Sequence, residues 1–206
     1  MNASTEKRLV AGPAGPIECA IDLAAESVVP RGMVLICHPN PSQGGTMDNK
    51  VVQTLARAFV QLGYRAVRFN FRGIGQSAGV WDEGSGEIDD ALAVLVAVRA
   101  PGEALVLAGF SFGAYIASQA ALRLPDGQKA QRMVLVGPAT NRFDTAAVPA
   151  DTLVIHGETD DVVPLSAVLD WARPQSLPVI VVPGVGHFFH GQLPLLKNLI
   201  LRNFAV

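Results

Sequence analysis

Short apolar runs alternate with longer amphipathic segments along most of this chain. From residue 33 onward, each apolar run ends at a glycine or a polar residue, and most are followed by apolar positions spaced three or four residues apart. The runs are typical of strands buried on both faces, and the spacing is typical of helices that bury one face. The pattern predicts strands at 32–37, 64–71, 105–108, 133–136, 152–155 and 179–182, and helices at 49–62, 87–98, 114–124, 164–171 and from the last strand to about 203.

The first part of the chain has a different pattern. Residues 7–11 and 16–23 are short apolar runs separated by Gly12-Pro13-Ala14-Gly15, which predicts a β-hairpin at a sheet edge. Because strands and helices alternate after it, we expect an α/β fold with a mainly parallel central sheet and helices on both faces. A length of 206 residues fits a single domain over residues 1–206.

Composition agrees with this fold class. Half of the residues are hydrophobic and 17% are charged, as expected where helices cover both faces of a parallel sheet. The formal net charge of −2 gives no reason to expect a nucleic-acid or membrane partner. No apolar run has transmembrane length, and the first residues lack the apolar core of a signal peptide, so we expect a cytoplasmic protein. Cys19 and Cys37 lie in apolar runs and are expected to be buried, reduced thiols rather than a disulfide or a metal site.

Candidate chemistry is concentrated after the strand that begins at Leu105. This run leads into Gly109-Phe110-Ser111-Phe112-Gly113, and an Ala-rich helical pattern follows. A strand that enters a helix through Gly-x-Ser-x-Gly is the context of a nucleophile elbow, which exposes the serine hydroxyl at the end of the strand. The two glycines would remove Cβ atoms that otherwise collide with the neighbouring strand and helix. The motif arises by chance in about one chain in ten of this composition, so its placement is the stronger argument.

Other polar residues follow other predicted strands: Asn40, Asp160 and His187. The carboxyl ends of parallel strands meet at one edge of a sheet, so we expect these residues to lie near Ser111. Ser111 would be a nucleophile, although a simple helix N-cap is the alternative.

At this point the sequence resembles the α/β-hydrolase superfamily, from about residue 7 to 203. Ser111, Asp160 and His187 follow the family order of nucleophile, acid and histidine. The segments 156–164 (His-Gly-x-x-Asp-x-x-Val-Pro), 184–189 (Gly-x-x-His-Phe-Phe) and 70–77 (Asn-Phe-Arg-Gly-x-Gly-x-Ser) resemble its acid motif, its histidine motif and the loop after its fourth strand. With the segments 38–41 and 44–50, the pattern is closest to small, lidless bacterial hydrolases described as dienelactone-hydrolase-like, although serine stands here where some of them have cysteine.

The resemblance implies an α/β-hydrolase fold without a lid domain, because only about 15 residues separate the strands that end at Val136 and begin at Thr152. It also implies a role for each site residue: Ser111 as nucleophile, His187 as base and Asp160 as the acid that orients the imidazole. His190 is the alternative base, expected at the start of the final helix. Asp161, otherwise a helix cap, and Glu158 are the alternative acids.

An oxyanion needs two amide donors. Phe112, directly after the nucleophile, would supply one from its backbone. Pro39 and Pro41 have no N–H, which leaves Asn40 as the second donor, unless 38–41 is only a rigid turn. His38 is expected to be structural.

Residues outside this set are expected to support it. Arg72 and Asn70 would tie adjacent loops together, and Trp81 would either line the pocket mouth or cover the core. We therefore expect a cofactor-free serine hydrolase that acts on a carboxylic ester or thioester of a small acyl compound. A peptidase or amidase with the same residues, or a non-catalytic binding protein with a hydrolase fold, is the alternative. The oligomeric state stays open, a homodimer included.

Overall fold

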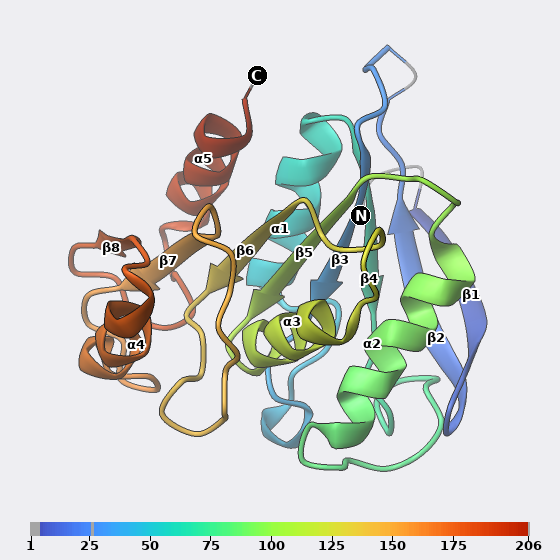
Figure 1. Cartoon of the computed structure of the whole chain (residues 1–206), viewed down its shortest axis with the longest axis horizontal. Helices are drawn as coiled ribbons and strands as arrows, with labels where there is room; N and C mark the ends of the chain where they lie inside the picture. The colour runs from blue at the N-terminus through green and yellow to red at the C-terminus, as the bar shows by residue number, and fades with distance from the viewer. Residues whose placement is uncertain (1–4, 26, 206) are drawn as a thin grey trace.

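The computed structural model describes residues 5–25 and 27–205, in which eight strands form one sheet (Figure 1). The order across the sheet is β1-β2-β4-β3-β5-β6-β7-β8. The strands are β1 (Thr5–Gly12), β2 (Gly15–Asp22), β3 (Gly32–Cys37), β4 (Tyr64–Phe69), β5 (Leu105–Phe110), β6 (Arg132–Val136), β7 (Leu153–Gly157) and β8 (Val179–Val182). β2 pairs antiparallel with β1 and β4, and the other neighbours pair in parallel. The mainly parallel sheet is therefore confirmed.

The N-terminal hairpin is also confirmed. β1 and β2 pair in register from Thr5 opposite Asp22 to Gly12 opposite Gly15, and β1 forms one edge of the sheet. Gly15 adopts a φ of 118°, which a residue with a side chain rarely adopts, so the sharp turn depends on glycine.

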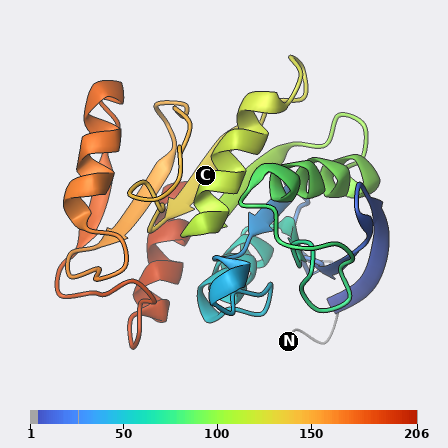
Figure 2. The same cartoon turned by 90° about the horizontal axis from the view of Figure 1, so that it is seen from below.

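Helices cover both faces of the sheet, as Figure 2 shows. They are α1 (Lys50–Gln61), α2 (Ser85–Val98), α3 (Phe112–Arg123), α4 (Leu165–Ala172) and α5 (Leu193–Phe204), with short 3₁₀ turns at Pro41–Gln43 and Arg173–Gln175. α1 and α5 pack on one face, and α2, α3 and α4 on the other. The expectation of helices on both faces is confirmed.

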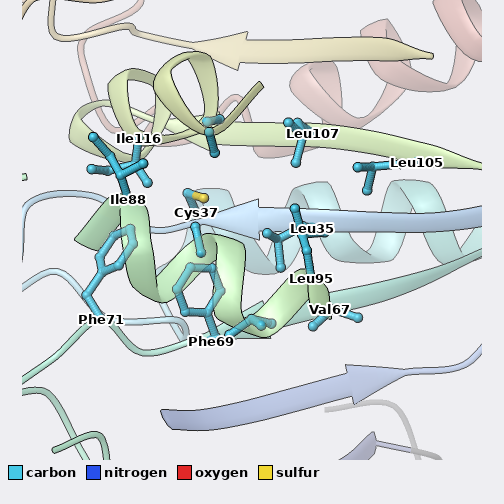
Figure 3. Close-up of a cluster of buried hydrophobic side chains, with 14 of the residues drawn as sticks. Leu35, Cys37, Val67, Phe69, Phe71, Ile88, Leu95, Leu105, Leu107 and Ile116 are labelled. Atoms are coloured by element: carbon cyan, nitrogen blue, oxygen red, sulfur yellow. The ribbon is translucent and has the colours of Figure 1, made fainter. Parts of the chain in front are cut away.

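Alternate residues of the central strands enter opposite cores. In β3, Leu35 and Cys37 point to the face covered by α2 and α3, where Figure 3 shows them packed with Phe69 and Leu107. Ile36 belongs to the cluster under α1 and α5. This burial on both faces explains why the central strands have continuous apolar runs rather than alternating polar residues.

Several predicted boundaries are wrong by a few residues. β4 ends at Phe69, and the side chain of the next residue, Asn70, accepts the N–H of Met47 and donates to the carboxylate of Glu18. Thr46 and Asp48, two residue types that often cap helices, lie just before α1 but do not cap it.

The cap of α1 is Asn49, whose side chain accepts the N–H of Val51 at 2.9 Å. Asp161 is not a helix cap, since α4 has Pro164 at its N-cap. His190 does not lie in the first turn of the final helix, which begins at Leu193.

No lid is inserted between β6 and β7, as the sequence predicts. The whole segment 137–152 is described, and it crosses from β6 to β7 without a helix. Among the described residues, no helix is both long enough and apolar enough to cross a membrane. Cys19 and Cys37 are both free and buried, in agreement with their prediction.

Candidate active site

Ser111 occupies the sharp turn between β5 and α3. All residues of β5 are buried, and α3 begins at Phe112 directly after the serine. The backbone of Ser111 has φ 57° and ψ −119°, and its N–H donates to the carbonyl of Val136 at 2.9 Å. A non-glycine residue with positive φ is strained, and such strain is concentrated at functional sites.

Gly109 and Gly113 make this turn sterically feasible. A Cβ on Gly109 would lie 2.2 Å from the carbonyl oxygen of Gly113. A Cβ on Gly113 would lie 2.1 Å from the carbonyl oxygen of Cys37 and 2.6 Å from that of His38. Both contacts involve backbone atoms that cannot move aside, so the expected collision of side chains at these positions is confirmed.

The structure brings Ser111, His187 and Asp160 together at the carboxyl edge of the sheet. Nε2 of His187 lies 3.0 Å from Oγ of Ser111, and Nδ1 lies 2.6 Å from Oδ2 of Asp160. An ionised carboxylate only accepts hydrogen bonds, so Nδ1 carries the ring proton and donates a hydrogen bond to Asp160. In the neutral ring Nε2 then accepts from the hydroxyl of Ser111. All three residues are at most 7% exposed, so solvent competes little for these bonds.

Asp160 is held as an ionised acceptor by its own turn. Its Oδ1 accepts the N–H groups of Val162 at 2.9 Å and Val163 at 2.7 Å. Burial by itself would raise the pKa of Asp160, but the hydrogen bonds from His187 and from the N–H of Val163 outweigh it and hold that pKa below its ordinary value. The carboxylate is therefore charged at neutral pH and fixed in direction.

His156 lies beside Asp160, and sequence reasoning gave it no role. It is fully buried in β7, its Nε2 lies 3.0 Å from the carbonyl of Val163, and the same nitrogen is 3.6 Å from Oδ2 of Asp160. Burial lowers the pKa of His156, so the ring is neutral and Nε2–H donates to the Val163 carbonyl. The ring thus holds the turn that carries Asp160. The sequence signal that could have identified His156 is its position four residues before Asp160, within the acid motif.

The alternative acid and base residues are turned elsewhere. Glu158 accepts the N–H of Gly184 at 2.8 Å, which links the turn after β7 to the turn after β8. Asp161 is exposed, unlike its neighbour Asp160. His190 is exposed as well, and its ring packs 5.8 Å from the ring of Phe188.

Asn40 lies in the turn after β3, which passes against the elbow through the contact of His38 with Gly113. Its Oδ1 accepts the N–H and the hydroxyl of Ser42, at 2.9 and 2.8 Å. Among the described residues, the backbone N–H groups of Asn40 and Phe112 donate no hydrogen bond. Phe112 is the first residue of α3, where amide groups lack partners within the helix.

Arg72 and Asn70 hold the surrounding loops, as the sequence predicts. Arg72 binds Asp90 of α2 through Nε at 2.9 Å and Nη2 at 2.8 Å. Asn70 joins Met47 to Glu18. Trp81 packs on the ring of Phe112 at 4.9 Å, and it also lines a hollow of about 590 Å³ beside α3, so it both covers the core and borders a depression.

Metal binding has no support in the part of the chain that the structure describes, since no group of three or more His, Cys, Asp or Glu side chains is arranged to hold a metal ion.

This chain is similar in sequence or structure to several known proteins. Residues 29–143 match the protein family described as "Serine aminopeptidase, S33". An uncharacterized protein of Rickettsia prowazekii is 32% identical over 194 residues, which cover 86% of this chain and 79% of that protein.

Two solved structures are similar over almost their whole length. One is a serine hydrolase without a lid from Xanthomonas campestris, with a TM-score of 0.89 and 38% identity over 98% of this chain and 94% of that chain. The other is an α/β serine hydrolase homologue from Coxiella burnetii, with a TM-score of 0.83 and 39% identity over 97% of each chain. The family match spans more than half of this chain. The chain therefore belongs to the serine aminopeptidase S33 family, within the α/β-hydrolase superfamily.

Proposed function

We propose that this protein is a serine hydrolase that cleaves a carboxylic ester or thioester of a small acyl compound through an acyl-enzyme. The observation that carries the proposal is the continuous hydrogen-bond chain from Ser111 through His187 to Asp160. These hydrogen bonds begin at a strained serine on a nucleophile elbow, in a protein of the α/β-hydrolase superfamily.

Ser111, His187 and Asp160 each have a role in the proposed reaction. A serine hydroxyl is a weak nucleophile at neutral pH, so Nε2 of His187 takes the proton of Ser111 as Oγ attacks the acyl carbon. His187 then gives that proton to the leaving oxygen or sulfur. Asp160 keeps the ring proton on Nδ1 and stabilises the imidazolium that forms. Water then attacks the acyl-enzyme with the same proton transfers through His187, and the acid is released.

The tetrahedral intermediate needs donors for its oxyanion. The backbone N–H groups of Asn40 and Phe112 are the proposed donors. Both lack partners among the described residues, and both belong to segments that meet at Gly113. Preorganised amide donors of this kind supply one of the largest contributions to acyl-transfer catalysis.

The surface beside His187 offers apolar contact and is open to water. Two open hollows of about 380 and 520 Å³ adjoin the turn after His187, and Phe188 lines both. Phe188 is 43% exposed, so it offers an apolar surface next to the reacting groups. Because the described segment between β6 and β7 forms no lid, water can reach the acyl-enzyme for the second half of the reaction.

Amide hydrolysis is the second candidate, because the matched family is described as a serine aminopeptidase. The same three side chains can cleave either bond. Comparing an aminoacyl p-nitroanilide with a p-nitrophenyl acyl ester separates the two, since a peptidase cleaves the anilide efficiently and the proposed esterase cleaves only the ester at a useful rate.

The direct test is to replace Ser111 with alanine and measure hydrolysis of p-nitrophenyl acetate. We expect kcat to fall at least about 10³-fold, because the nucleophile is gone while the fold remains. Ser85→Ala, at an exposed position that begins α2, is the matched control and should keep wild-type activity. A fluorophosphonate probe should label the wild type and the control but not S111A. An S111A protein with wild-type turnover would disprove the proposal.

A further inference from the structure

His38 is completely buried, and both of its ring nitrogens have backbone partners. The N–H of Phe71 lies 3.1 Å from Nε2, and the carbonyl oxygen of Pro39 lies 2.7 Å from Nδ1. A backbone N–H can only donate, so Nε2 is the acceptor and carries no proton. The ring proton is therefore on Nδ1, and Nδ1–H donates to the Pro39 carbonyl.

The hydrogen bond to the carbonyl of Pro39 also fixes the peptide unit that joins Pro39 to Asn40. The carbonyl of Pro39 and the N–H of Asn40 belong to one planar peptide unit, and in a trans peptide they point in opposite directions. Holding the oxygen in place therefore sets the direction of the N–H. The carbonyl of Asn40 is held on its other side by the N–H groups of Gln43 at 3.1 Å and Gly45 at 3.0 Å.

The backbone of His38 also lies where the two proposed oxyanion donors meet. The carbonyl oxygen of His38 would be 2.6 Å from a Cβ on Gly113, so the backbone of His38 rests directly on the first turn of α3. Phe112, the other proposed donor, is the preceding residue of that turn. His38 thus contacts the elbow through its backbone and the Asn40 peptide through its ring.

We propose that His38 is a positioning residue that aims the backbone N–H of Asn40 at the substrate oxyanion, through its hydrogen bond to the carbonyl of Pro39. The inference rests on the proposed function, in which that N–H is one of two oxyanion donors. His38 itself touches neither the substrate nor Ser111 in this role.

The ionisation of His38 suits a fixed positioning group. Burial lowers its pKa to about 4, although the hydrogen bond to Pro39 opposes the shift. The ring therefore stays neutral through the neutral pH range, and Nε2 stays free to accept from Phe71. A protonated ring would place a second donor against the N–H of Phe71 and would break the arrangement.

Two substitutions separate the two hydrogen bonds of the ring. In His38→Asn the amide nitrogen lies near the position of Nδ1 and can still donate to Pro39, but nothing accepts from Phe71. In His38→Gln the amide oxygen can reach the position of Nε2 and accept from Phe71, but the donor to Pro39 is lost. Both variants lose the ring and its packing on Phe71, so they form a matched pair.

The pair is assayed with p-nitrophenyl acetate and with a trifluoromethyl ketone, whose adduct with serine carries a tetrahedral oxyanion. We expect H38Q to lose about 10- to 100-fold in kcat with KM within about twofold of wild type, because one donor is misdirected only in the transition state. The inhibition constant of the ketone should rise by the same factor. H38N should keep kcat within about threefold of wild type.

A second pair of variants tests whether His38 acts through Asn40. Asn40 has a φ of −51°, which proline can adopt, so Asn40→Pro removes the N–H and Asn40→Ala retains it. If the inference holds, adding H38Q to N40P causes no further loss of kcat, whereas adding it to N40A does. Additive losses in both backgrounds would overturn the inference.

Three further outcomes would contradict the role proposed for His38. Equal losses in H38Q and H38N that follow their thermal stabilities would show a structural role only, and wild-type kcat in H38Q would also overturn the inference. ¹⁵N NMR of the wild-type ring requires no variant, and a proton on Nε2 would contradict the assigned hydrogen bonds. Turnover by S111A in the same assay would instead disprove the proposed function, so the two failures are distinguishable.

Discussion

Ser111 can hold a strained conformation because the residues two positions before and after it are glycines, which have no side chains. A non-glycine residue in this conformation costs about 1–3 kcal/mol, so the surrounding structure must hold it in place. Gly109 and Gly113 let α3 approach β5 and β3 closely enough to do so. The strain also lifts Oγ away from the helix and toward His187, which joins local backbone geometry to the proposed chemistry.

At the residue scale, the motif residues were predictable and the residues that hold them were not. Ser111, Asp160 and His187 follow predicted strands in motifs that the sequence displays. The roles of His38 and His156 depend instead on which backbone carbonyl each buried ring reaches. No spacing rule encodes that choice, because it is made by loops from different parts of the chain.

Replacing Asp160 with asparagine tests the proposed orientation of His187. We expect kcat to fall about 10⁴-fold, because the amide can present N–H to Nδ1 and stabilise the wrong tautomer of the ring. Asp161→Asn, at the exposed neighbouring position, should leave kcat unchanged. An Asp160→Asn enzyme that retains most of its activity would contradict the proposed role.

The same variant has a defined effect on the pH dependence of stability. The pKa of Asp160 is lowered in the folded protein, so its carboxylate stabilises the fold above the unfolded pKa of about 3.9 and this contribution is lost as pH falls through the folded pKa. The free energy of unfolding, measured with urea, should therefore favour wild type over D160N most strongly at neutral pH. The gap should shrink below about pH 4, and a gap that widens on acidification would be inconsistent with this sign.

At the scale of elements, periodicity located the strands and α-helices of the described residues but not the cap of α1. Thr46, Asp48 and Asn49 are all good N-cap residues near the start of α1. Asp48 is unsuitable because its Oδ1 is already bound by Arg68 at 2.9 Å, and Thr46 bonds the N–H of Asp48 at 3.2 Å. Asn49 is therefore the cap, and the reason that excludes Asp48 lies in a distant strand rather than in the local sequence.

Asn49→Ala should destabilise the protein through α1. The substitution removes the acceptor for the N–H of Val51 and should lower the free energy of unfolding by about 1 kcal/mol. Thr46→Ala is the matched control, and it should cost less because its hydrogen bond is longer and lies outside the helix. Urea unfolding of both variants measures the difference, and a greater loss in T46A would refute the assignment of the cap.

At the scale of the whole molecule, the class of fold was predictable and the strand order was not. Alternating strands and helices imply a parallel sheet with two covered faces, whatever the order of its strands. The position of β4 between β2 and β3 depends on how the connections cross the sheet, and hydrophobic periodicity does not record that. The same arrangement buries Arg68, the more deeply buried of the two arginines in β4.

Arg68 joins the N-terminal hairpin to the rest of the sheet. Its side chain is 4% exposed, and its Nε binds Oδ2 of Asp22 in β2 at 3.1 Å, while its Nη1 binds Oδ1 of Asp48 at 2.9 Å and the carbonyl of Met47 at 3.0 Å. The three partners come from β2 and from the loop before α1. One buried guanidinium therefore fixes two segments against β4.

Arg68→Met should lower the free energy of unfolding by about 3–5 kcal/mol, because it leaves the Asp22 carboxylate buried without its cation. The double variant Arg68→Met, Asp22→Asn removes the uncompensated charge and should recover part of that loss. Arg173→Met is the control, since Arg173 and Asp170 form an exposed pair that should contribute less than about 1 kcal/mol. Urea unfolding at neutral pH gives all three values. If R68M cost no more than R173M, or if the double variant were less stable than R68M alone, the buried ion pair would not be what secures the hairpin.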